Sequence, residues 1–156
     1  MMRARWASAL LRGAVAGFAG AAAMHAFRLV WESANRHQRE HGIFGFDKEA
    51  DVRGAEWLVR GLAGHALSHR SAQGLGLALH YLYGIAIGAA YAAAETRLEW
   101  LSNIRTAPAS AVLWLLADEI PVTITDISDP LDRSVRSHAG ALAAHLVYVA
   151  TVRGIL

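Results

Sequence analysis

The stretch "GLALHYLYGIAIGAAYAAAE", residues 76–95, decides the fold, because it is apolar almost throughout and has the length of a membrane span. A helix that crosses the ~30 Å hydrocarbon layer needs ~20 mostly apolar residues, at a rise of ~1.5 Å each. One imidazole, His80, stands near the start of the stretch, and one carboxylate, Glu95, ends it. The sequence therefore predicts a transmembrane helix that contains a histidine.

The composition of the whole chain agrees with a membrane location. Its 156 residues are 54% hydrophobic, and the mean hydropathy is positive. This length predicts a single transmembrane domain over residues 1–156. The formal charge of +2 comes without a basic face, which excludes nucleic acid as a partner. The chain has no cysteine, which excludes disulfides, iron–sulfur clusters and thiol catalysis.

Apolar blocks of membrane-spanning length occur at four places, residues 13–31, 74–94, 107–125 and 138–156. They predict an all-α protein, an integral membrane four-helix bundle. Pro108 suits the first turn of the third block, and Pro121 is expected to kink its far end. An alternative for the first block is a signal peptide, because small residues that suit cleavage follow its apolar part.

The polar stretch between the first two blocks contains an amphipathic helix, predicted over residues 48–69. Its apolar residues recur at helical spacing, and Trp57 suits the headgroup level of a membrane, so we expect it to lie at the interface. Arginines flank the spans on the side of both termini, whereas the loop between the last two spans is acidic. The positive-inside rule then predicts that both termini lie in the cytoplasm.

Ionisable residues within the four blocks fall at one predicted depth. Counted from the outer ends of the spans, they lie six or seven residues in, which is ~9–10 Å below the outer boundary. Each predicted span contributes to this layer, whose members are His25, His80, Asp118, Glu119 and His145. Because ionisable groups are costly inside a membrane, we expect them to face the interior of the bundle and pair there.

Three further polar residues are predicted to support this layer. Arg28 lies one helical turn from His25 and is expected to neutralise Asp118 or Glu119. Tyr83 and Tyr148 each follow a histidine by three residues, so each is expected to hydrogen-bond a ring nitrogen or a bound oxygen.

Several interpretations of the layer stay open at this point. The side chains satisfy one another without a cofactor, or neutral imidazoles and a carboxylate bind a transition metal such as zinc, iron or copper. Alternatively, His80 and His145 ligate a b-type haem, with Gly84, Gly88 and Gly140 making room for the macrocycle. A further alternative is translocation of protons or small solutes through the layer.

A structural role without a cofactor is the remaining alternative, as a subunit of a membrane complex or as a homo-oligomer in the lipid bilayer. The segments "GAVAG" and "GIAIG" favour it, because small residues allow helices to pack closely. No serine stands in a nucleophile elbow and no Glu-x-x-His motif is present, so no catalytic residue is assigned and the protein is expected not to be an enzyme.

Two segments resemble a known family. The run "HYLYGIAIGAAYAAAE", residues 80–95, is similar to the central span of the YagU-like bacterial inner-membrane proteins, and "AHLVYVA", residues 144–150, is similar to their last span. The matching positions are His80, Glu95 and His145. In the third span the family has a histidine and a Phe-Pro where this chain has "LADEIPV", so Asp118 or Glu119 replaces that imidazole. The family is functionally uncharacterised, and the resemblance implies only a membrane fold.

The leading prediction is a small, non-enzymatic membrane protein whose polar layer binds a transition-metal ion. The predicted ligands are His25, His80, His145 and either Asp118 or Glu119. Tyr83, Tyr148 and Arg28 are predicted to surround them.

Overall fold

The computed structural model describes residues 2–34, 48–98, 100–116, 120 and 135–156. All regular secondary structure in these residues is helical, which confirms the all-α prediction. The main helices are α1 (Met2–Ala34), α2 (Lys48–Ala63), α3 (His69–Glu95), α5 (Thr106–Trp114) and α7 (Val135–Ile155), and α4 (Trp100–Asn103) is a single short turn.

Local sequence explains where α2 and α3 meet. The amphipathic helix was predicted to reach residue 69, but α2 ends at Ala63, because Gly64 adopts a left-handed φ of 70° and its amide bonds back to the Arg60 carbonyl. A new helix starts almost at once. Ser68 caps α3 by accepting a hydrogen bond from the Ser71 amide, so α3 begins earlier than the predicted second span.

The third predicted span, residues 107–125, lies largely outside the described residues. Its described part, α5, begins at Thr106 with Pro108 in the first turn, where a missing amide hydrogen costs nothing. Within that turn the Ser110 hydroxyl donates to the Thr106 carbonyl over 2.7 Å. The kink expected at Pro121 also falls outside the described residues.

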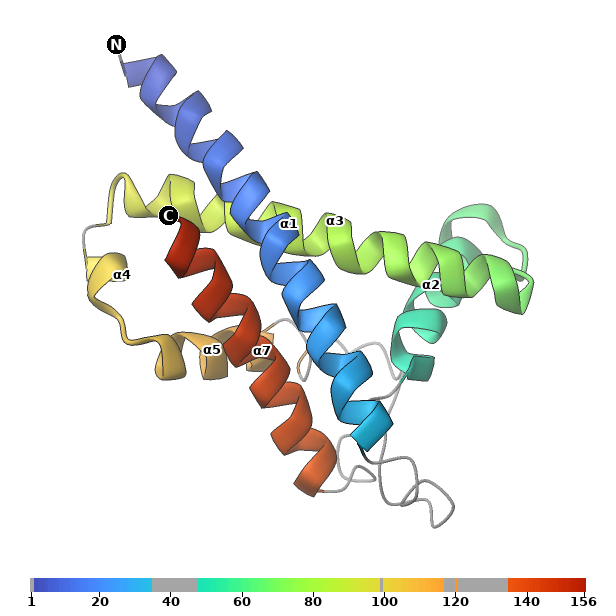
Figure 1. Ribbon diagram of the computed structural model, residues 1–156. Helices are drawn as coiled ribbons and strands as arrows, with labels where there is room; N and C mark the ends of the chain where they lie inside the picture. Colours follow the sequence, from blue (N-terminus) through green and yellow to red (C-terminus); the bar gives the residue numbers. More distant parts are fainter. Residues whose placement is uncertain (1, 35–47, 99, 117–119, 121–134) are drawn as a thin grey trace.

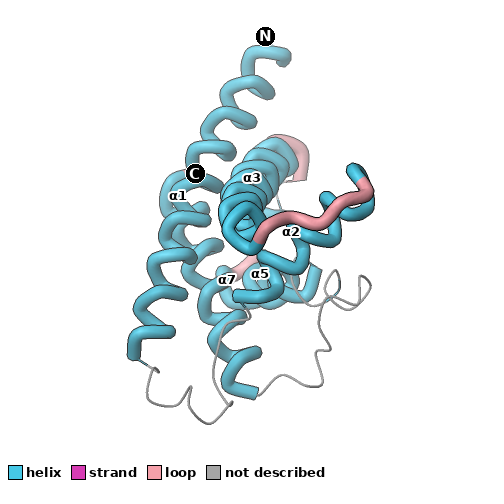
Figure 2. Tube along the Cα trace, turned by 90° about the vertical axis from the view of Figure 1, so that its right-hand side faces the viewer, coloured by secondary structure: helices cyan, strands magenta, loops and turns pink. Residues whose placement is uncertain are grey.

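The long helices α3 and α7 both run opposite to α1 (Figures 1 and 2). α1 runs antiparallel to α3, because Trp6 lies under Arg97 at one end of the pair and His25 lies beside His80 toward the other. α1 is also antiparallel to α7, with Arg12 bonded to the Leu156 carbonyl. Both chain ends therefore lie on one side of the helix assembly.

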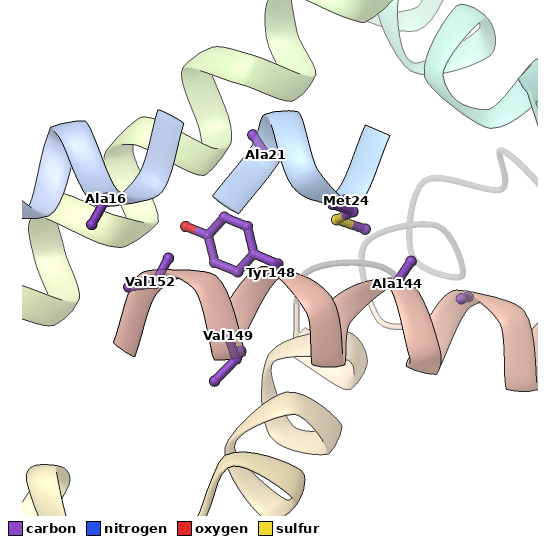
Figure 3. Close-up of a cluster of buried hydrophobic side chains, with 8 residues drawn as sticks. Ala16, Ala21, Met24, Ala144, Tyr148, Val149 and Val152 are labelled. Carbon is purple, nitrogen blue, oxygen red and sulfur yellow. The ribbon is translucent and has the colours of Figure 1, made fainter. Parts of the chain in front are cut away.

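The buried core lies where α1 meets α7 (Figure 3). Its members are mostly small, and the largest of them, Tyr148, reaches from α7 toward α1 and α3. The cluster consists of Ala16, Ala21, Met24, Ala141, Ala144, Tyr148, Val149 and Val152. Because α1 supplies part of this cluster, removing the helix as a cleaved signal peptide would expose the core.

Two of the described helices are long and apolar enough to cross a membrane, residues 6–34 of α1 and the whole of α3. Only 28% and 22% of their most apolar windows are buried, so they differ from the core helix of a soluble protein. α7, which carries two histidines and two arginines, is not among them. Many large apolar side chains on α1 and α3 point outward, among them Leu11, Val15, Phe18, Val30 and Leu82.

Candidate functional site

Glycines at the crossing of α1 and α3 bring the two backbones into contact. The segments "GAVAG" of α1 and "GIAIG" of α3 face each other, as close packing through these glycines predicted. A methyl group at Gly88 would overlap the Gly13 carbonyl and lie 2.6 Å from the Cα of Gly17. A methyl group at Gly17 would overlap the Gly84 carbonyl in the same way. Only glycine permits this approach, so the four residues fix where the helices cross.

Two turns along α1 from Gly17, the same helix pair meets through rings instead of backbone. The ring centroids of His25 and His80 are 6.3 Å apart and the rings are tilted by 50°. Tyr81 borders both, with centroids 6.2 Å from His25 and 5.6 Å from His80. Of the predicted layer, the structure thus brings together the histidines of the first and second predicted spans.

A main-chain contact defines the tautomer of His80 in its neutral form. Its Nε2 lies 3.3 Å from the carbonyl oxygen of Ala21, which only accepts hydrogen bonds. Nε2 therefore donates, and the lone pair of the neutral ring is on Nδ1. Histidines that bind metals usually donate their second ring N–H to a carbonyl or carboxylate in this way.

His145 is oriented by the same kind of contact within its own helix. It is buried in α7, and its Nδ1 donates to the Ala141 carbonyl over 2.9 Å, which leaves the lone pair on Nε2. One turn further on, the Tyr148 hydroxyl donates to the Gly84 carbonyl over 2.7 Å, and Gly84 is itself one turn past His80. Tyr148 thus connects the His145 region of α7 to the His80 region of α3.

The two tyrosines predicted to support the layer lie in different surroundings. The Tyr148 hydroxyl donates to the main chain of α3 at Gly84, and its contact with a histidine or a bound oxygen stays a prediction. Tyr83 is 49% exposed on the outside of α3. Tyr81, the residue after His80, faces α1 and is the aromatic neighbour of both histidines. The expectation of a tyrosine three residues after each histidine did not predict it.

The remaining predicted residues stand as follows. Arg28 is half-buried on α1, one turn past His25. Its predicted partners Asp118 and Glu119 lie outside the described residues. At the described end of α5, Trp114 already lies against His138 of α7, with ring centroids 6.0 Å apart.

Glu32 is a buried carboxylate, and it directly follows the first predicted span, residues 13–31. It is 8% exposed, because α1 continues to Ala34 and carries it onto the inner face. The signal was present in the sequence, since His25, Arg28 and Glu32 follow a spacing of three and four residues that places them on one helical face.

We call the contact of α1 and α3 at Gly13, Gly17, Gly84 and Gly88 the glycine crossing. It affects the haem alternative and the structural-subunit alternative. The haem alternative needs open space at Gly84 and Gly88, but the α1 backbone and side chains occupy it. The structural-subunit alternative relied on "GAVAG" and "GIAIG", and these segments pack against each other within the chain. Neither alternative gains support from these glycines.

Within the residues that the structure describes, no three histidine, aspartate or glutamate side chains converge as a group that could hold a metal ion. His25 and His80 thus form a pair, and further protein ligands would have to come from elsewhere in the chain. Compared with known proteins, the chain matches no family model, no curated protein and no solved structure. The resemblance to the YagU-like proteins stays a prediction.

Proposed function

We propose that this chain is a membrane-embedded helical protein that binds a first-row transition-metal ion between α1 and α3, with His25 and His80 as the first two ligands. The observation that carries the proposal is the pair of imidazoles across the helix contact, one of which has its tautomer defined by the Ala21 carbonyl.

Membrane crossing by α1 and α3 is supported by their length, their apolar composition and their outward-facing side chains. Histidines inside such helices are costly unless they are satisfied or functional. Both chain ends lie on the same side of the assembly, which agrees with the positive-inside orientation that places both in the cytoplasm at a bacterial inner membrane. Two further spans, 107–125 and 138–156, complete the proposed four-helix bundle.

The separation of the rings suits a shared ion. Two imidazoles that bind one metal through ~2.0–2.1 Å bonds have ring centres ~5–6 Å apart, depending on the angle at the metal. The 6.3 Å between His25 and His80 needs only a small rotation of either ring to reach this range.

Further ligands are proposed from the other two predicted spans. His145 carries its lone pair on Nε2, and Asp118 or Glu119 would supply a carboxylate, giving the mixed nitrogen and oxygen set that zinc or iron accepts. Neutral imidazoles are required, so binding should weaken as the pH falls through ~6. We assign no catalytic role to the ion.

The test is metal binding by detergent-purified protein. Wild type should retain zinc or iron after dialysis, and absorbance should separate a haem, which has an intense Soret band, from a simple ion. His80→Ala and His25→Ala should each lower the metal affinity 10-fold or more, since one ligand of few is lost. The matched control is His69→Ala, whose imidazole is exposed at the start of α3 and bonds the Gln73 side chain.

Two results would contradict the proposal. Metal that stays bound in both ligand variants would place the site elsewhere, and metal lost equally from the His69→Ala control would indicate adventitious binding to surface histidines. Circular dichroism of each variant checks that the helices remain folded.

A further inference from the structure

Four arginines from separate parts of the chain gather at the end of the helix assembly that carries both termini. We call Arg12, Arg97, Arg105 and Arg153 the arginine end. They belong to α1, to the residues just past α3, to the residue before α5, and to α7.

Three contacts join these arginines to neighbouring elements of the structure. Arg97, just past α3, lies over the Trp6 ring of α1 at 4.4 Å, and Arg12, two turns along α1, donates to the Leu156 carbonyl at the end of α7. Arg153, also near the end of α7, donates to the Ile104 carbonyl, and Arg105 is the next residue after Ile104. Three of the four arginines are thus held by contacts between elements at this end of the assembly, and the fourth adjoins one of those contacts in sequence.

The geometry points to a binding site for the phosphate headgroup of an anionic phospholipid. The cation–π contact occupies the face of the Arg97 guanidinium, whereas phosphate binds its edge, so the stacking on Trp6 orients the donors without using them. Arg105, the residue before α5, is exposed. Arginine suits this ligand better than lysine, because its planar fork matches two phosphate oxygens.

Neighbouring side chains distinguish a lipid from a soluble phosphate. Trp100 is 59% exposed near the arginines, and tryptophan prefers the headgroup level of a membrane. Leu10, Leu11 and Val15 are exposed on the adjoining turns of α1, where acyl chains would lie. A soluble phosphate ester would gain nothing from this apolar surface, whereas a lipid contacts both parts.

Arginines outnumber acidic residues at this end. Glu95 and Arg153 both lie near the Tyr91 hydroxyl in the last turn of α3, and Glu99 lies outside the described residues. Counted by sequence, Arg3 and Arg5 also precede the first span, so six arginines stand against two glutamates at this end. Basic residues beside a span attract anionic lipids in this way.

The site rests on the proposed membrane location, so the experiment examines the two separately. Full-length protein is first tested for extraction from membranes by alkaline carbonate, which leaves only embedded proteins behind. The protein in neutral detergent is then titrated with phosphatidylglycerol or phosphatidylcholine, and bound lipid is counted by native mass spectrometry. Wild type should prefer phosphatidylglycerol.

The test variant is Arg97→Gln with Arg105→Gln, because Arg12 and Arg153 instead hold neighbouring elements through hydrogen bonds to main-chain carbonyls and are kept. Each arginine at a membrane surface contributes about fivefold to anionic lipid binding, so the double variant should bind phosphatidylglycerol ~25-fold more weakly. The matched control, Arg60→Gln with Arg70→Gln, removes the same charge from exposed positions on α2 and α3 away from the arginine end. A lysine pair at 97 and 105 keeps the charge and should lose less.

The outcomes separate cleanly. Equal affinity of wild type for the two lipids, or equal loss in the control, overturns the lipid site while leaving the membrane location intact. Saturation by water-soluble glycerol phosphate without lipid would instead assign the arginines to a solute. Release of wild type by carbonate would overturn the membrane location and the lipid site together.

Discussion

The contact between α1 and α3 has two parts that differ in kind. Around Gly17 and Gly88 the backbones themselves touch, whereas two turns along α1 the helices meet only through the rings of His25, His80 and Tyr81. Helices that cross must diverge on either side of the crossing point, so the wedge beside the glycines is wide enough for an imidazole pair. The glycine crossing thus sets the separation between α1 and α3 at which the rings of His25 and His80 meet.

The largest effect is expected from filling the crossing. Gly88→Ala places a methyl group against the Gly13 carbonyl and the Cα of Gly17, which are backbone atoms and cannot move aside separately. We expect a loss of ~1–3 kcal/mol or more in the free energy of unfolding, measured by titrating the detergent-solubilised protein with a denaturing detergent. The separation of His25 and His80 should change with it, and metal affinity should fall.

Gly74→Ala provides the control on the same helix. A methyl group there meets nothing within 4 Å, so the variant should be stabilised by up to ~1 kcal/mol through helix propensity alone. If both variants behaved alike, the crossing would be looser than the structure indicates, and the contrast between the two parts would disappear.

A smaller effect is expected at the link between α7 and the crossing. Tyr148→Phe removes the hydrogen bond to the Gly84 carbonyl and keeps the buried ring in the core. Hydrogen bonds between helices contribute ~0.6–1.5 kcal/mol, so the free energy of unfolding should drop by that amount in the same assay. Tyr83→Phe, at an exposed ring on α3, should leave it unchanged. A silent Tyr148→Phe would mean that ring packing alone holds α7 in place.

The sequence was most informative about the helices and the glycine crossing. Length and apolar composition predict a helix over residues 76–95 without any tertiary information, and paired small residues at a spacing of four predict close helix approach. Helix ends were predictable in principle, since Ser68 and Gly64 follow known capping rules. The helix predicted over residues 48–69 nevertheless ran past Gly64, because its apolar pattern was followed without regard to the cap.

The site was predicted only in part, because the sequence did not show the direction in which each side chain points around its helix axis. Counting residues along a span gives depth, and it predicted one depth for His25 and His80, whose ring centroids lie 6.3 Å apart in the structure. It does not give the direction in which a side chain points around the helix. Tyr83 and Tyr81 lie at nearly the same depth, yet only the second faces α1, and this depends on where the glycines place the crossing.

The smallest effect on stability is expected at the ring contact itself. His25 is half-buried, and its ring neighbours lie at centroid distances above 6 Å, so His25→Ala removes little packing. Replacing a polar ring inside an apolar span with alanine also removes the cost of burying it. In metal-free protein the free energy of unfolding should therefore change by less than ~1 kcal/mol, close to that of Leu29→Ala at an outward-facing position of the same helix. With metal present, wild type alone should gain stability, because the ion binds only the folded form. A loss above ~2 kcal/mol without metal would instead make the ring contact a structural part of the interface, like the glycines, and would remove the reason to assign it a binding role.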